Sequence, residues 1–167
     1  ITLSQSSCSN NIVSSQIIIA RAGKINSIDP AQASTFPALQ VISALGDTLY
    51  ILDKDGSLKP QLAKSLPKIS DQGLTISIPL KRNILFHDGT EFNSYAMKFT
   101  LNRFIKIGTL NYILDGKIKS IETPDPYLIK LRLTKPSSSI TKLLTTKNLT
   151  PISPNAYLKY KDKFLNK

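Results

Sequence analysis

The sequence predicts an α+β fold, in which mixed or antiparallel sheets are flanked by helices. Apolar and polar residues alternate in residues 74–80 and again in 128–133, as they do in strands that bury one face. Residues 93–104 instead repeat apolar side chains at helical spacing, and turn dipeptides such as Asp88-Gly89 separate the segments. With 167 residues, 41% of them apolar, the chain is long enough to bury a sizeable core.

A strand and then a helix are predicted at the start of the chain. Residues 16–22 are rich in β-branched side chains, which is typical of a buried strand. A turn at Asp29-Pro30 follows it. The helix is predicted over 36–45, because Thr35 can cap its beginning and Gly46 can end it. Its predicted inner face holds Leu39, Ile42 and Leu45.

Short strands and turns are predicted between residues 48 and 80. Residues 48–52 form a strand, and Lys54-Asp55-Gly56 forms a hairpin turn. A second turn at 71–73 leads into the alternating strand at 74–80. The side chains that this strand would bury are Leu74, Ile76, Ile78 and Leu80.

The second half of the chain begins with the predicted helix at 93–104. Asn93 is a suitable N-cap, because its side chain can accept hydrogen bonds from the first free amides of a helix. The predicted apolar positions are Ala96, Met97, Phe99, Thr100, Leu101 and Phe104. The other predicted elements are strands at 117–122 and 128–133 around a turn at 123–126, a short helix at 138–144, and a loop at 151–158 that enters a further helix.

The net charge is +11, from 22 basic and 11 acidic residues, and most of the excess lies in the second half. Residues 81–167 carry sixteen basic and six acidic groups. This excess makes a small basic nucleic-acid-binding domain an alternative interpretation. However, only four of the basic residues are arginines, and the lysines are dispersed. We therefore interpret the charge as a solvated surface, with no nucleic acid as partner.

The most specific pattern in the chain is residues 80–93, which read Leu-Lys-Arg-Asn-Ile-Leu-Phe-His-Asp-Gly-Thr-Glu-Phe-Asn and lead to Arg103. This stretch resembles the signature of the extracytoplasmic solute-binding proteins, family 5, of peptide and nickel ABC importers. Further blocks resemble the family in the same order, so that the resemblance covers about residues 16–160. These blocks are Ile28-Asp29-Pro30, residues 54–65, residues 70–75, residues 121–127, residues 133–137 and Pro151-Ile152-Ser153-Pro154.

The resemblance implies that residues 16–167 are the N-terminal part of lobe I of a two-lobed periplasmic binding protein-like fold, with the rest of the protein missing from this fragment. It implies the substrate-binding component of an ABC importer, which captures peptides or a similar small solute and delivers it to the permease subunits in the membrane. Such a protein closes on its ligand by hinge motion and needs no cofactor.

In this family, the segment after the Asp-Pro motif lines the cleft between the lobes. The resemblance therefore implies that Ser34, Thr35 and Phe36 are ligand-binding residues, which could pair with the backbone of an extended peptide. An alternative interpretation is a helix cap at Thr35 and a core side chain at Phe36. Tyr112 is a further candidate, because a tyrosine in a loop can contact a ligand through its ring and its hydroxyl.

The beginning of the chain suggests an export signal. Ser6-Ser7-Cys8 resembles the end of a bacterial lipoprotein signal, in which the cysteine becomes lipid-modified. The resemblance implies that residues 1–15 are a signal-peptide remnant and a tether, and that the protein is periplasmic and anchored to the cytoplasmic membrane through Cys8. The alternative is a lone thiol at the terminus. Because Cys8 is the only cysteine, an intramolecular disulfide is excluded.

His87 is the only histidine, and its neighbour Asp88 suggests a metal or catalytic site. A metal site needs three or four converging ligands, and no second histidine or nearby cysteine supplies them. Nucleophilic catalysis needs a base that a third group orients, and no serine or cysteine motif provides this arrangement. We therefore expect a structural turn at His87-Asp88-Gly89, no metal site and no enzyme activity.

Overall fold

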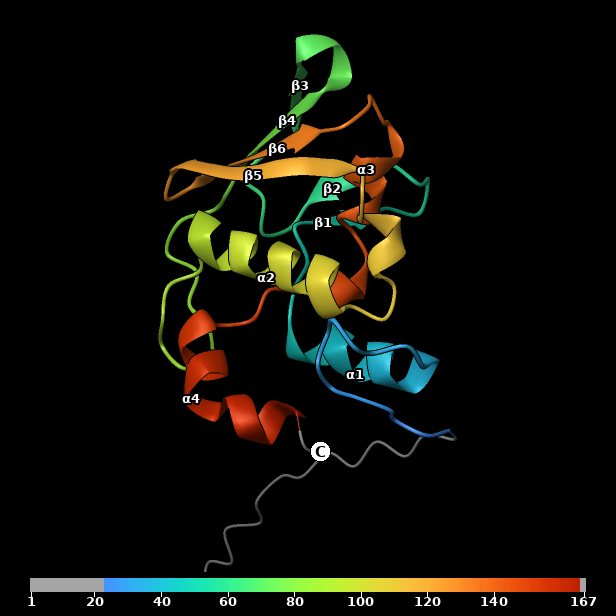
Figure 1. The fold of residues 1–167 in the computed structure, drawn as a ribbon, viewed down its shortest axis with the longest axis vertical. Coiled ribbons are helices and arrows are strands. Elements are labelled where there is room, and N and C mark those ends of the chain that lie inside the picture. The colour runs from blue at the N-terminus through green and yellow to red at the C-terminus, as the bar shows by residue number, and fades with distance from the viewer. Residues whose placement is uncertain (1–22, 166–167) are drawn as a thin grey trace, which may run out of the picture.

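The computed structural model describes residues 23–165, which form helices and antiparallel sheets (Figure 1). The predicted strand at 16–22, the predicted tether at 1–15 and Cys8 lie outside the described residues. The helices are α1 (Phe36–Leu45), α2 (Ser94–Ile107), α3 (Ser139–Leu143) and α4 (Pro154–Leu165), with short 3₁₀ helices η1 (Asp71–Gly73), η2 (Asn111–Ile113) and η3 (Lys147–Leu149). The strands are β1 (Tyr50–Leu52), β2 (Leu58–Pro60), β3 (Lys68–Ser70), β4 (Thr75–Pro79), β5 (Ile118–Asp125) and β6 (Leu128–Leu133).

The main sheet has four antiparallel strands in the order β3-β4-β6-β5. Its two central strands place apolar residues opposite each other, with Ile76 paired to Leu131 and Ile78 paired to Ile129. All four of these side chains are buried, as predicted. The prediction is wrong for Leu74, which precedes β4 and keeps 37% of its surface exposed. Strands β1 and β2 form a separate antiparallel pair.

Helix α2 lies along one face of this sheet (Figure 1) and closes the main core. Its Met97, Leu101 and Phe104 side chains are fully buried. The predicted cap is confirmed, because the Asn93 side chain accepts hydrogen bonds from the amides of the second and third helical residues, at 3.1 and 3.0 Å. The helix continues three residues beyond the predicted end and stops at Gly108.

The predicted turn at 123–126 is wrong, because strand β5 continues to Asp125. Proline is tolerated there because β5 is an edge strand, where a missing amide N–H breaks no ladder bond on the open side. The predicted strand at 48–52 begins only at Tyr50, since the Thr48 amide donates instead to the side chain of Gln61. The short strands β2 and β3 were not predicted, because three residues carry too little periodicity.

The predicted bounds of helix α1 are confirmed, but its inner face is smaller than expected. Ala38 and Ile42 are buried, whereas Leu45 keeps 53% of its surface exposed. Gly46 ends the helix close to Thr150, where a side chain in its place would come within 2.7 Å of the threonine methyl group. The absence of a side chain at this position therefore lets the end of α1 approach residues that follow η3.

Candidate ligand-binding region

A buried ion pair fixes the segment that leads into α1. The Asp29 carboxylate meets the Arg103 guanidinium of α2 through two bonds, with Nη1 at 2.7 Å from Oδ1 and Nη2 on Oδ2. The side chains are only 3% and 7% exposed. Paired bonds of this kind fix orientation as well as adding stability. The sequence patterns did not reveal this pair, because the two residues are 74 positions apart.

The predicted ligand-binding residues directly follow this segment. One acceptor, the side-chain oxygen of Asn26, binds the amides of Ser34 and Thr35 at 3.2 Å each. The Thr35 hydroxyl lies 3.0 Å from this oxygen and 3.0 Å from the carbonyl oxygen of Lys24. Thr35 stands at the cap position but makes no side-chain cap bond, and Phe36 is 69% exposed. The alternative interpretation is therefore right that Thr35 is the N-cap residue of α1, but wrong that Phe36 is a core side chain in the described part of the chain.

Tyr112 lies on η2, and its side chain is 67% exposed. Thr109, three residues earlier, donates hydrogen bonds to the carbonyl oxygens of Ala31 and Gln32. The residues just before η2 therefore lie beside the segment that leads to Ser34. The geometry is compatible with Tyr112 as an additional contact, which stays a prediction.

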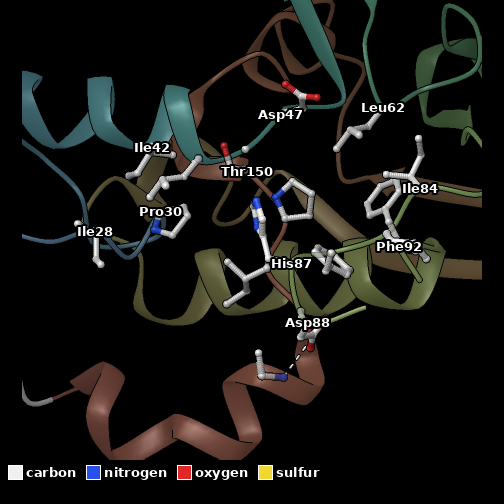
Figure 2. Close-up of a pocket in the computed structure, with 18 of the residues that line it drawn as sticks. Ile28, Pro30, Ile42, Asp47, Leu62, Ile84, His87, Asp88, Phe92 and Thr150 are labelled. Atoms are coloured by element: carbon white, nitrogen blue, oxygen red, sulfur yellow. Dashed lines mark hydrogen bonds between the residues drawn. The ribbon is translucent and has the colours of Figure 1, made fainter. Parts of the chain in front are cut away.

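A pocket of about 850 Å³ lies elsewhere (Figure 2). Its walls come from the C-terminal end of α1, the loop at 84–88 and residues 150–156. Most of the lining is apolar, and four of its large apolar or aromatic side chains keep between 43% and 64% of their surface exposed: Ile28, Leu45, Leu85 and Tyr160. The pocket includes none of the four predicted ligand-binding residues.

His87 points into this pocket between Ile42 and Ile84 (Figure 2). The predicted turn is confirmed, because the Gly89 amide donates to the carbonyl oxygen of Phe86 at 2.9 Å and Gly89 has a positive φ of 79°. Asp88 accepts a hydrogen bond from the Ser153 hydroxyl at 2.5 Å and another from the Thr90 hydroxyl at 2.6 Å. These hydroxyls, Ser153 first, lower the pKa of the Asp88 carboxyl below its usual value.

No group of three or more potential metal ligands is present in residues 23–160, whose side chains the structure describes. Asp88 is occupied in joining the turn to the start of α4, where Ser153 also accepts a hydrogen bond from the Ala156 amide. The described side chains around His87 therefore suit packing and positioning. The pocket surface that they form is mostly apolar, with a few hydrogen-bonding groups.

The family model of the bacterial extracellular solute-binding proteins, family 5 Middle, matches residues 57–167. Among curated relatives, the glutathione-binding protein GsiB of Escherichia coli O1:K1 is 33% identical over 147 residues. The match covers 87% of this chain and 28% of the relative. The chain thus spans less than a third of the length of this relative.

Solved structures agree with this match. Listeria monocytogenes OppA bound to peptide has a TM-score of 0.79 and 23% identity, covering 86% of this chain and 31% of that protein. NikZ from Campylobacter jejuni in complex with Ni(L-His) has a TM-score of 0.70 and 28% identity, covering 87% and 28%. The predicted α+β class, as part of a periplasmic binding protein fold, is confirmed. With two thirds of its residues matching one family model, the chain belongs to the bacterial extracellular solute-binding proteins of family 5.

Proposed function

We propose that this chain is the N-terminal part of lobe I in the substrate-binding component of an ABC importer. The complete protein captures a peptide or a similar small solute outside the cytoplasmic membrane and delivers it to the permease subunits. The names of the relatives support this class of ligand, since they include a glutathione-binding protein and a protein bound to peptide. Glutathione is itself a small peptide. Binding and release by hinge closure need no catalytic group.

The observation that carries the proposal is the geometry before α1. A buried ion pair and the Asn26 side chain hold a backbone segment that ends in the exposed ring of Phe36. An extended peptide can bind beside such a segment through its own backbone, while pockets for its side chains give selectivity. A second lobe would enclose the other side of the ligand, because small-molecule sites bury most of the ligand surface.

The test is isothermal titration calorimetry of the complete protein with di- to pentapeptides and glutathione. We expect binding, and we expect Phe36→Ala to weaken it at least about tenfold, because burying a phenylalanine ring is worth ~1.5–3 kcal/mol. His87→Ala is the matched control and should leave the affinity within about twofold. The isolated 167-residue chain should not bind, because it lacks the second wall. Loss of binding in His87→Ala with normal binding in Phe36→Ala would assign the ligand to the pocket instead.

Nucleic-acid binding, the alternative suggested by the charge of +11, is not favoured by the family match. Generic DNA should bind weakly, and about 200 mM salt should abolish this binding. A filter-binding titration at low and high salt checks the expectation. Submicromolar binding that survives the higher salt would contradict the importer proposal.

Lipid anchoring through Cys8 stays a prediction, because this residue lies outside the described part of the chain. In residues 23–165, no helix is long and apolar enough to cross a membrane. Mass spectrometry of the exported protein, with Cys8→Ser as the control, would detect the lipid modification. An unmodified thiol would remove the anchor and leave the periplasmic location to be tested separately.

A further inference from the structure

The backbone before the candidate ligand-binding residues is held at every carbonyl from residue 29 to residue 33. Inside this segment, the amides of Gln32 and Ala33 both donate to the Asp29 carbonyl oxygen, at 3.0 and 2.9 Å. From outside, Thr109 binds two more carbonyl oxygens, through its amide at 2.9 Å and through its hydroxyl at 3.0 Å. Backbone groups satisfied from several directions cannot readily adopt a second arrangement.

Asn148 binds the two remaining carbonyl oxygens of the segment, those of Pro30 and Ala33. Its side-chain nitrogen donates to Pro30 O at 2.8 Å and to Ala33 O at 2.7 Å. The residue is 1% exposed, and its side-chain oxygen has no hydrogen-bond partner among the described residues. The amide cannot be turned around, because its oxygen would then face two carbonyl oxygens. Asn148 is therefore used only as a double donor to this segment.

Arg103 fixes the same segment through the side chain of Asp29. Its two bonds to the Asp29 carboxylate come from α2, whereas Asn148 comes from η3. The Asp29 carboxylate also accepts from the Ala31 amide at 3.1 Å, so that the ion pair is joined directly to the backbone turn. The segment is thus clamped by side chains of two elements, α2 and η3, that do not include any predicted ligand contact.

We propose that Asn148 and Arg103 are positioning residues for ligand binding. By fixing the backbone at 29–33, they hold Ser34, Thr35 and Phe36 in the ligand-binding arrangement before a ligand arrives. The inference rests on the proposed function for its final step. Its physical basis is that a segment ordered in advance does not lose conformational freedom on binding, and this raises affinity.

The experiment measures two quantities on the complete protein, for Asn148→Ala and for Arg103→Lys. The first is hydrogen exchange at the amides of Ser34 and Thr35, which reports local opening of the segment without any ligand. The second is affinity for the peptide or glutathione that the unaltered protein binds in calorimetry. We expect about tenfold faster exchange and about tenfold weaker binding in Asn148→Ala, and losses of similar size in Arg103→Lys, because lysine keeps the charge but cannot form both bonds to the carboxylate.

Two control variants separate positioning from general stability. Ile129→Val shortens a fully buried side chain of β6 and lowers stability without touching the segment. Arg132→Lys repeats the Arg103 substitution at an arginine that is 41% exposed. Both controls should leave local exchange and affinity unchanged. The positioning role would be overturned if Ile129→Val lost as much affinity and exchange protection as Asn148→Ala. Normal exchange at Ser34 and Thr35 in Asn148→Ala would also overturn it.

A different outcome overturns the proposed function. If the unaltered complete protein binds none of the peptides and no glutathione, the function fails, and with it the claim that the fixed segment serves a ligand. Altered exchange in Asn148→Ala would in that case still establish the clamp itself. If the unaltered protein binds but Asn148→Ala changes only exchange, the segment is clamped but its order does not contribute to affinity.

Discussion

The region around α2 and the region around α1 are held together in different ways. In the α2 region, a full layer of apolar side chains lies between the helix and the four-stranded sheet, including Phe104 and Leu131. In the α1 region, the buried apolar cluster consists of Ala33, Ala38 and Ile42, and Leu39 packs against it. Polar groups of α2, of η3 and of Thr109, which precedes η2, hold the segment before α1 instead.

The difference matters because the two kinds of interaction do different things. Apolar burial contributes most of the stability but tolerates changes of shape that preserve volume. Hydrogen bonds to charged groups or to buried carbonyls add less stability, yet they require specific distances and angles. A region that presents residues to a ligand gains more from fixed geometry than from additional stability. Hydrogen bonds fix the geometry of the segment before α1, whereas apolar burial supplies the stability of the α2 region.

The largest expected effect is the loss of a core ring in the α2 region. Phe104→Ala should lower the free energy of unfolding by about 3–5 kcal/mol, because it removes a fully buried ring and leaves a cavity. Leu45→Ala, at a half-exposed position of α1, should cost less than about 1 kcal/mol. Urea unfolding of both variants checks the comparison. Equal losses would contradict the division into two regions.

A smaller effect is expected at the turn formed by His87, Asp88 and Gly89. Gly89 has a φ of 79°, and an added Cβ would meet no atom within 4 Å. Gly89→Val should therefore cost about 1–2 kcal/mol through backbone strain alone. Gly89→Asn is the matched control, since asparagine tolerates this conformation, and it should cost less. Thermal unfolding gives both values, and an unchanged melting temperature in Gly89→Val would contradict the assignment.

The smallest effect concerns acid sensitivity at the same turn. The Ser153 and Thr90 hydroxyls lower the pKa of Asp88 in the folded protein, so the stabilisation is present above the ordinary carboxyl pKa. It is lost as the pH falls through the lowered value, which places the window below about pH 4. Asp88→Asn should therefore have a lower free energy of unfolding than the unaltered protein at pH 7, and the difference should shrink at low pH. Urea unfolding from pH 7 to pH 3 tests this.

Ser153→Ala provides the matching variant, because it removes the main partner and keeps the carboxyl group. It should weaken the acid dependence in the same pH range. If the free energies of unfolding of Asp88→Asn and the unaltered protein differ by the same amount at every pH, the hydroxyls do not act through the charge of Asp88.

Local patterns predicted the elements well and the long-range bonds poorly. The bounds of α1 follow from Thr35 and Gly46, residues adjacent to the helix, and the main strands follow from alternation. The Asn148 bonds to Pro30 and Ala33 leave no periodic trace, because the partners are 118 and 115 residues apart. The pocket was missed for the same reason, since it joins α1 to the loop around His87. The ligand-binding role of Ser34, Thr35 and Phe36 stays a prediction.

The distance in sequence between Asn148 and Pro30 also sets an order of events during synthesis. At ~5–20 residues per second, a ribosome needs roughly 6–24 s to make the intervening chain. The contacts within the α2 region link residues much closer together, and short loops close at a lower entropic cost. The segment that presents Ser34 to Phe36 is therefore made among the first parts of the described chain, but two of the bonds that fix it cannot form until Asn148 has been made.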